Sequence, residues 1–259
     1  MLLGKNIVII GGTTGIGLSA ALAFIELGAN VVAIGRNAES CALAKEQFGI
    51  QGMTLSCDAR DATAAPQAIA ECQKRWGDLH GLYHVAGGSG RKFGDGPLHD
   101  LTLEGWRATL DLNLTSVMLS NRAAVQTFLT QGHGGVILNM GSVLGHYPSP
   151  VHFSTHAYAA AKAAIVGFSK STAAYYAKDD IRVNVIAPAL VETPMAKRAA
   201  EDPAISEFIK TKQPLGGGRI GWPTDLDGAA SLLLSDQASF ITGQVLNIDG
   251  GWSISEGQI

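Results

Sequence analysis

Two side chains in the second half of the chain, Tyr158 and Lys162, have the types and the spacing needed for proton transfer. Residues four apart lie on one face of a helix, so the phenol and the ammonium group can reach the same small volume. A phenol with an ordinary pKa near 10 exchanges protons at neutral pH only if its pKa falls by roughly three units, or about 4 kcal/mol. One ammonium group at about 4 Å supplies roughly that energy at an effective dielectric constant near 20, before desolvation removes part of it. The pair predicts a general acid/base, although a plain helix-face contact has the same spacing.

Two further polar residues stand where a reaction could use them. Ser142 follows the apolar run 136–140, and a hydroxyl at the end of a strand can both donate to and accept from a substrate oxygen. It has no His and Asp partners nearby in sequence, so we do not predict a nucleophile. Asn113 lies within an unusually long helical pattern, 103 to about 129, where an amide competes for backbone groups. It predicts either a kink with a functional side chain or an exposed, neutral asparagine.

A ligand site is predicted near the N-terminus, where a strand pattern runs into glycines and then into a helix pattern. Residues 7–10 are apolar and β-prone, residues 11–17 contain four glycines, and residues 18–27 are rich in Ala and Leu. Glycines allow a sharp turn and a close approach to a ligand, and the helix N-terminus offers N–H groups to a phosphate. The stretch predicts a site for a dinucleotide pyrophosphate; a simple connecting loop is the alternative.

Strand and helix patterns alternate along the chain, and they must position these groups. Apolar runs at 7–10, 30–34, 53–57, 79–85, 136–140, 182–187 and 244–248 predict strands. Helices are predicted at 18–27, 38–48, up to Trp76, from 103 to about 129, from about 156 to 178, and at 225–235. This alternation predicts one α/β domain over residues 1–259, a doubly wound, Rossmann-type parallel sheet of seven strands with helices on both faces. The weakly patterned segment 192–221 is predicted to be a lid over the site.

Composition narrows the class of protein. With 46% hydrophobic and 16% charged residues, the chain is apolar enough for a sheet covered on both faces. A net charge of −3 without a basic cluster argues against a nucleic-acid partner. Three cysteines without zinc or disulfide spacing predict free thiols in a cytoplasmic protein, and the histidines show no metal-ligand spacing, so no metal is predicted. We expect no signal peptide and no membrane span.

Together these motifs resemble those of the short-chain dehydrogenase/reductases over nearly the whole chain, from Gly11 to Gly251. The resemblance implies that Tyr158 is the general acid/base and that Lys162 lowers its pKa and binds the nicotinamide ribose. It also implies that Ser142 orients the carbonyl or alcohol and that Asn113 supports a water-linked proton relay. The cofactor-binding residues implied by the resemblance are Gly11, Thr13, Thr14, Gly15, Ile16, Arg36, Asn37, Asp58, Ala59, Ala86, Gly87, Gly88, Tyr158, Lys162, Pro188, Val191 and Thr193.

Two positions bear on which nicotinamide cofactor is bound. About 20 positions past the glycines, dinucleotide folds place an acidic residue for the ribose 2′-hydroxyl or an arginine for a 2′-phosphate. This chain has Gly35 and Arg36 there, which favours NADP(H). NAD(H) stays possible because the nearby Glu39 could reach a ribose. Asp58, which follows a strand, is expected to accept a hydrogen bond from the adenine amino group.

The chain departs from the family pattern at His84-Val85-Ala86-Gly87, where Asn-Asn-Ala-Gly is usual. We expect this change to remove a side-chain amide that helps tie the central sheet. Contacts to the cofactor through the backbone of Ala86 and Gly87 should remain.

The leading hypothesis is an NADP(H)-preferring oxidoreductase that interconverts a carbonyl and a secondary alcohol, acting on a small or aromatic, uncharged substrate. The same reaction with NAD(H) is one alternative, and a non-catalytic nucleotide sensor is another, although such a protein would typically have lost the tyrosine or the lysine. An acyl carrier protein partner is disfavoured because no Lys or Arg occurs in residues 123–161. The resemblance also suggests a homotetramer, with the helices around Thr109 and Ala173 at an interface.

Overall fold

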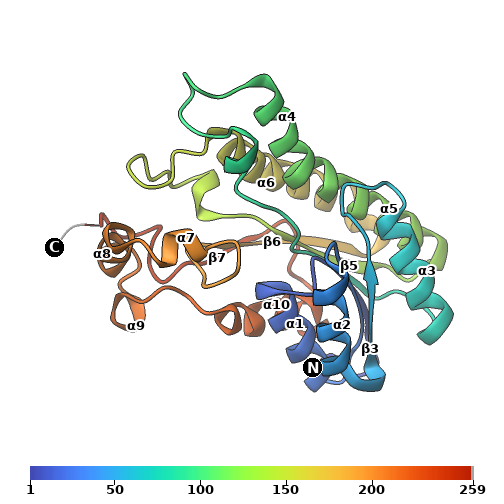
Figure 1. The fold of residues 1–259 in the computed structure, drawn as a ribbon. Coiled ribbons are helices and arrows are strands. Elements are labelled where there is room, and N and C mark those ends of the chain that lie inside the picture. Colours follow the sequence, from blue (N-terminus) through green and yellow to red (C-terminus); the bar gives the residue numbers. More distant parts are fainter. Residues whose placement is uncertain (258–259) are drawn as a thin grey trace.

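A seven-stranded, all-parallel sheet with helices on both faces forms the computed structural model, which describes residues 1–257 (Figure 1). The strand order β3-β2-β1-β4-β5-β6-β7 means that the chain winds outward in one direction from β1 and in the other from β4. The doubly wound, single-domain prediction is therefore confirmed. The strands are β1 (Asn6–Ile10), β2 (Asn30–Gly35), β3 (Gly52–Ser56), β4 (Gly81–His84), β5 (Gly135–Met140), β6 (Ile181–Pro188) and β7 (Val245–Ile248).

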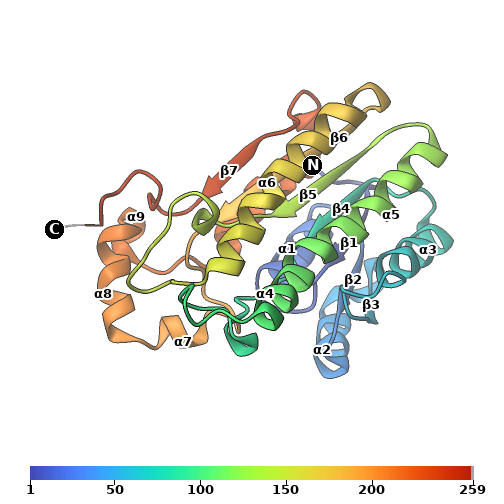
Figure 2. The ribbon, with the colours of Figure 1, turned by 90° about the horizontal axis from the view of Figure 1, so that it is seen from above.

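The helices form two layers, one on each face of the sheet (Figures 1 and 2). One layer contains α1 (Gly15–Glu26), α2 (Ala38–Phe48) and α10 (Asp227–Leu234). The other contains α3 (Ala64–Trp76), α5 (Ser116–Gln131) and α6 (His156–Tyr176), with α4 (Leu103–Leu110) packed against α6. Helix α4 continues into α5 through one π-helical turn, Asp111–Thr115, so the long helix predicted from residue 103 is interrupted at Asn113.

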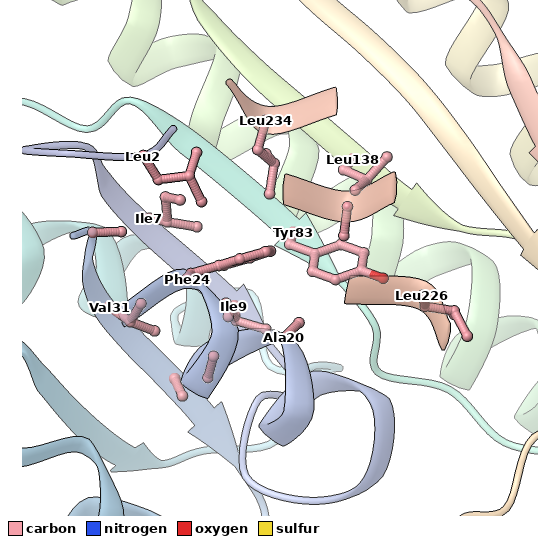
Figure 3. Packing of buried hydrophobic residues seen from close by; sticks show 14 of the residues in the cluster. Leu2, Ile7, Ile9, Ala20, Phe24, Val31, Tyr83, Leu138, Leu226 and Leu234 are labelled. Atoms are coloured by element: carbon pink, nitrogen blue, oxygen red, sulfur yellow. The ribbon is translucent and has the colours of Figure 1, made fainter. Parts of the chain in front are cut away.

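The central strands are buried on both faces, which is why they read as continuous apolar runs. In the core beneath α1, Phe24 and Tyr83 lie side by side with ring centroids 6.2 Å apart (Figure 3). Leu138 of β5 and Leu234 of α10 belong to the same buried cluster. This packing fixes α1, and with it the preceding glycine turn, against the middle of the sheet.

Several predicted boundaries shift by a few residues. Helix α1 begins at Gly15 rather than at residue 18, and the helix predicted at 225–235 is a 3₁₀ turn, Pro223–Leu226, followed by α10. Strand β4 is shorter than the predicted 79–85 because the backbone of Leu79 pairs with the Gln131 side chain instead of a neighbouring strand. The segment 192–221 contains three short helices, which Figure 2 shows at one end of the molecule: α7 (Lys197–Ala200), α8 (Pro203–Lys212) and α9 (Leu215–Gly218).

Within residues 1–257, no helix combines the length and the apolar character that crossing a bilayer requires.

Candidate active site

A cavity of about 400 Å³ opens at the carboxyl ends of the strands, where ligands of open α/β sheets bind. Its walls come from the segments that follow β1 through β6, and Trp252, after β7, also contributes. All the cofactor-binding residues expected from the sequence lie on these walls, together with Ser142. Asn113 is different, because its amide lies behind the wall and bonds to the backbone of Gly88.

The turn from β1 to α1 leaves no room for side chains. A Cβ on Gly11 would lie 2.7 Å from the Ala86 nitrogen, and a Cβ on Gly17 would lie 2.0 Å from the Gly11 carbonyl oxygen. Gly11 also has a φ of +86°, which favours glycine. The first N–H groups of a helix have no partner within it, and no side chain caps the start of α1 at Gly15. A close backbone and free N–H groups fit a pyrophosphate, and these residues therefore fit a dinucleotide.

One end of the cavity, beyond β2 and β3, holds Arg36 and Asp58. The Asp58 carboxylate pairs with Arg60 at 2.7 Å, and this hydrogen bond, opposed by burial, lowers the pKa of Asp58. Asn37 lies on the same wall and accepts a hydrogen bond from the Ser40 nitrogen at 2.8 Å, which caps α2. Local hydrogen bonds therefore orient both Asp58 and Asn37 at this end.

At the same end, position 35 has no room for an acidic side chain that would bind the ribose hydroxyls. A Cβ on Gly35 would lie 2.0 Å from Thr13 Oγ1, so an aspartate does not fit there without rearrangement. Glu39 lies on the exposed first turn of α2 and, in the described chain, is not part of the cavity wall. With position 35 and Glu39 set aside, Arg36 is the residue of this segment that can bring a charge to the expected ribose position.

The other end brings Tyr158, Lys162 and Ser142 together. Tyr158 and Lys162 both lie on α6, and Lys162 Nζ is 5.5 Å from the centre of the Tyr158 ring. The same Nζ donates to the Met140 carbonyl oxygen at 2.8 Å, two residues before Ser142. The Ser142 hydroxyl accepts from the Leu144 nitrogen, and it lies near enough to Tyr158 to lower the pKa of the phenol. Three groups, two from α6 and one from the end of β5, thus share one small volume.

Burial dominates the protonation of the Tyr158 and Lys162 pair. It raises the pKa of the Tyr158 phenol, and the hydrogen bond with Ser142 opposes that rise. It lowers the pKa of Lys162 to about 7. From the sequence, Lys162 is expected to lower the pKa of Tyr158. The Lys162 ammonium group lies over the Tyr158 ring and donates to Met140, and the expected effect on the phenol stays a prediction.

Asn113 lies in the π-helical turn and is completely buried. Its Nδ2 donates to the carbonyl oxygens of Gly88 and Thr109, both at 2.9 Å, and its Oδ1 accepts from the Gly88 nitrogen at 3.1 Å. The helix is broken at Asn113 as predicted, by a π-helical turn, and the exposed alternative is wrong, while a functional side chain stays a prediction. In this structure the amide fixes the loop that follows β4.

Asp95 is a site residue that sequence reasoning missed. This buried carboxylate accepts from the Ala157 and Tyr158 nitrogens, both at 2.9 Å. Thr155 supplies no side-chain cap to α6, so a residue about 60 positions earlier in the chain does so and complements the helix dipole. In sequence Asp95 is one of several charges in a glycine-rich loop, and no local spacing distinguishes it. It fixes the backbone of Tyr158.

His84, which replaces the usual asparagine, is completely buried. Its Nδ1 lies 2.7 Å from Ser120 Oγ and its Nε2 lies 3.2 Å from the Ala86 carbonyl oxygen. Because a carbonyl oxygen only accepts, Nε2 carries the proton and Nδ1 accepts from the serine hydroxyl. The amide is lost as expected, and in its place the imidazole joins β4 to α5 and holds the turn at Ala86.

We expect His84→Asn to make the protein more resistant to acid. Burial, together with the charge of Lys162, lowers the pKa of His84 to about 3. Between pH 3 and 6.5 the folded state thus binds fewer protons here than the unfolded chain, so stability is lost as the pH falls through that range. Between pH 7 and 4, wild type should lose about 3 kcal/mol more unfolding free energy than the variant. Urea denaturation at both pH values measures this difference, and parallel losses would contradict it.

The wall next to Tyr158 contains residues from distant segments. Phe153 belongs to the loop 147–153 that precedes α6, and it lines the cavity. Arg91, Arg198 and Trp252 also line it, although no motif indicated them. Within residues 1–257, no group of three or more His, Cys, Asp or Glu side chains is arranged to hold a metal ion.

Comparisons with known proteins cover nearly the whole chain. A family model described as enoyl-(acyl carrier protein) reductase matches residues 11–253. A 2,5-dichloro-2,5-cyclohexadiene-1,4-diol dehydrogenase from Sphingobium indicum is 32% identical over 251 residues, covering 96% of this chain and 97% of the relative.

Two solved structures have the same fold. A short-chain type dehydrogenase/reductase from Mycobacterium ulcerans has a TM-score of 0.89 at 30% identity, covering 98% of this chain and 91% of the other. A 3-ketoacyl-(acyl-carrier-protein) reductase from Brucella melitensis, complexed with NADH, has a TM-score of 0.86 at 27% identity, covering 98% and 100%. With the sheet order, the glycine turn and the grouping of Tyr158, Lys162 and Ser142, these matches show that the chain belongs to the short-chain dehydrogenase/reductase family.

Proposed function

We propose that this oxidoreductase prefers NADP(H) and interconverts a carbonyl group and a secondary alcohol. The observation that carries the proposal is the grouping of Tyr158, Lys162 and Ser142 at one end of a cavity whose other parts fit a dinucleotide. When bound, the nicotinamide supplies or accepts the hydride. The named activities of the relatives, a cyclic diol dehydrogenase and a ketoacyl reductase, belong to this reaction class.

Tyr158 is the proposed proton donor to the carbonyl oxygen. Burial raises the pKa of its phenol, so at neutral pH it holds the proton that carbonyl reduction needs. Ser142, whose side chain also acts on the Tyr158 phenol, would donate to the same substrate oxygen. Lys162, with a pKa of about 7, is partly protonated near neutral pH, and its positive form would stabilise the phenolate left behind. In alcohol oxidation the phenolate would accept the proton.

Asn113 has a supporting role in this proposal. Its amide holds the loop at Gly88, which lines the cavity beside the expected nicotinamide position. The water-linked proton relay implied by the family resemblance remains part of the proposal. Segment 192–221, which contributes Thr193 and Arg198 to the wall, is the proposed lid.

NADP(H) preference is proposed from three features of the ribose end. Arg36 lies on the wall, Gly35 has no space for an acidic side chain, and Glu39 lies outside the wall. A guanidinium group there suits a 2′-phosphate. Because the Brucella relative was solved with NADH, the same reaction with NAD(H) is the alternative that a direct comparison of the two cofactors must test.

Arg36→Asp is expected to lower kcat/KM for NADPH by about 10- to 100-fold, since a charge-assisted pair becomes a repulsion. Activity with NADH should change little. Lys74→Asp changes the net charge equally on the exposed face of α3 and serves as the control. Steady-state kinetics with both cofactors give the ratio. An unchanged NADPH/NADH ratio would place the cofactor preference elsewhere.

We also propose a cytoplasmic homotetramer, as the family resemblance suggests. Thr109 and Ala173 are themselves buried within the single chain, so only the outer faces of their helices could pack against another subunit. Light scattering in solution measures the oligomeric state.

A further inference from the structure

The end of the cavity near Tyr158 carries positive charge that neither the cofactor nor the proton transfer uses. Within the described chain, the acidic residue on the cavity wall is Asp58, at the ribose end and paired with Arg60. The basic residues on the wall are Arg36, Arg91, Lys162 and Arg198. Arg36 is assigned to the ribose end and Lys162 to the phenol, which leaves two arginines without a role.

Arg91 lies at the catalytic end. Its Nη2 donates to the His152 carbonyl oxygen at 3.3 Å, next to Phe153. Four residues later in the same loop, Asp95 caps the first turn of α6 at Tyr158. The half-buried guanidinium group is therefore held beside the end of α6 that carries the phenol.

Arg198 reaches the same region from α7. Burial is the main cause of the lowered pKa of Arg91. The positive charge of Arg198 lowers this pKa further, while the charge of Asp95 raises it. Both Asp95 oxygens already accept from backbone N–H groups, so this carboxylate is not free to neutralise two guanidinium groups. Two like charges that face one cavity favour an anion between them.

Neither arginine is engaged in an ion pair among residues 1–257. The neighbouring Lys197 differs, because it pairs with Glu201 at 3.8 Å and does not line the cavity. On this short helix, the cation that faces the cavity is thus the one without an acidic partner.

An aromatic wall lies next to these charges. Phe153 and Trp252 both line the cavity, with ring centroids 5.9 Å apart in an edge-to-face arrangement. Trp252 is fixed by the hydrogen bond from Nε1 to the Tyr147 carbonyl oxygen at 3.2 Å. Trp252 is itself buried and supports Phe153 from behind, so the partly exposed Phe153 ring is the aromatic face that a substrate ring can pack against.

We propose that the substrate is a ring-bearing oxo or hydroxy acid whose carboxylate is bound by Arg91 and Arg198 and whose ring packs on Phe153. The planar guanidinium group suits this ligand because it donates two parallel hydrogen bonds to a carboxylate. The inference rests on the proposed function for its redox step, and it replaces the uncharged substrate expected from the sequence. Hydride and proton transfer occur at the ring carbonyl, while the carboxylate is unchanged.

A binding experiment tests the charge preference without turnover. Calorimetric titration of the protein saturated with NADP⁺ uses cyclohexanecarboxylate and the neutral cyclohexanecarboxamide as probes. We expect the carboxylate to bind at least about tenfold more tightly. Arg198→Gln and Arg91→Gln should each remove this preference, and Lys197→Gln, the matched control on α7, should keep it. Arg198 is exposed, so its variant tests the proposal even if the Arg91 variant fails to fold.

Kinetics separate this inference from the proposed function. The kcat/KM for 4-oxocyclohexanecarboxylate should exceed that for its methyl ester in wild type, and Arg198→Gln should make the two values similar. Equal binding of the acid and the amide by wild type would overturn the inference. So would an Arg198→Gln variant that loses NADPH affinity but keeps the acid preference, because Arg198 would then serve the cofactor phosphates. A carboxylate preference in binding without turnover of any ketone would support the anion site and refute the proposed reaction.

Discussion

Replacing Tyr158 by phenylalanine is expected to lower kcat by about 10³-fold, because the change removes the proton donor and leaves the ring in place. Cofactor affinity should change little, since the glycine turn and the ribose end are untouched. Loss of NADPH absorbance over a panel of ketones measures turnover, and NADPH fluorescence measures binding. The serine and the helix cap from Asp95 remain, so the loss reports on the hydroxyl itself.

Tyr147→Phe is the matched control for the Tyr158 variant. Tyr147 belongs to the loop beside the cavity and touches Trp252 through its backbone carbonyl, so removing its hydroxyl should leave kcat nearly unchanged. Full turnover by Tyr158→Phe with every reactive substrate would refute the mechanism. A wild-type protein that binds NADPH and turns over no carbonyl or alcohol would support the sensor alternative instead.

The Lys162→Met variant is expected to be more stable than wild type and to lose most of its activity. Burial lowers the pKa of Lys162 to about 7, from an ordinary value of 10.5. Between these values the unfolded chain binds more protons than the folded state, so deprotonation on folding costs roughly 4 to 5 kcal/mol at pH 7. Methionine removes this penalty but leaves the Met140 carbonyl oxygen without its donor, which costs about 1 to 3 kcal/mol. A net gain of about 2 kcal/mol follows from these values.

The pH dependence of stability identifies the source of that gain. From pH 7 to 10 the free energy of unfolding of wild type should rise through the Lys162 contribution, and the variant should lack this rise. Lys170→Met, on the exposed side of the same helix, is the control and should behave like wild type. Denaturant titrations across this range give the slopes. A Lys162→Met protein that is less stable than wild type at pH 7 would contradict the expectation.

Most of the fold could be predicted because its signals are local. The buried strands are short apolar runs. Nearby residues in the sequence are also enough to recognise the glycine turn, Ser142 at the end of a strand, and the Tyr158-Lys162 pair. The π-helical turn at Asn113 also has a local contribution, since the Asn113 amide donates to the carbonyl oxygen of Thr109, four residues earlier.

Contacts between distant segments could not be predicted. Asp95 bonds to nitrogens about 60 residues away, and His84 satisfies its ring through Ser120 on another element. The protonation of Tyr158 and Lys162 was also beyond prediction, since it depends on how much of each group the fold removes from water. Spacing gives the distance between two groups but not their desolvation.

The loop that contains Asp95 has a consequence for protein engineering. One end of this loop carries Arg91 toward the cavity, and the other end holds the start of the helix that bears Tyr158. Loop exchange is a common route to new substrate selectivity. Here a graft that replaces the loop also removes Asp95, the carboxylate that holds the backbone of Tyr158. Substrate selectivity and turnover therefore change together when this loop is exchanged. A redesign of selectivity must keep the carboxylate at position 95.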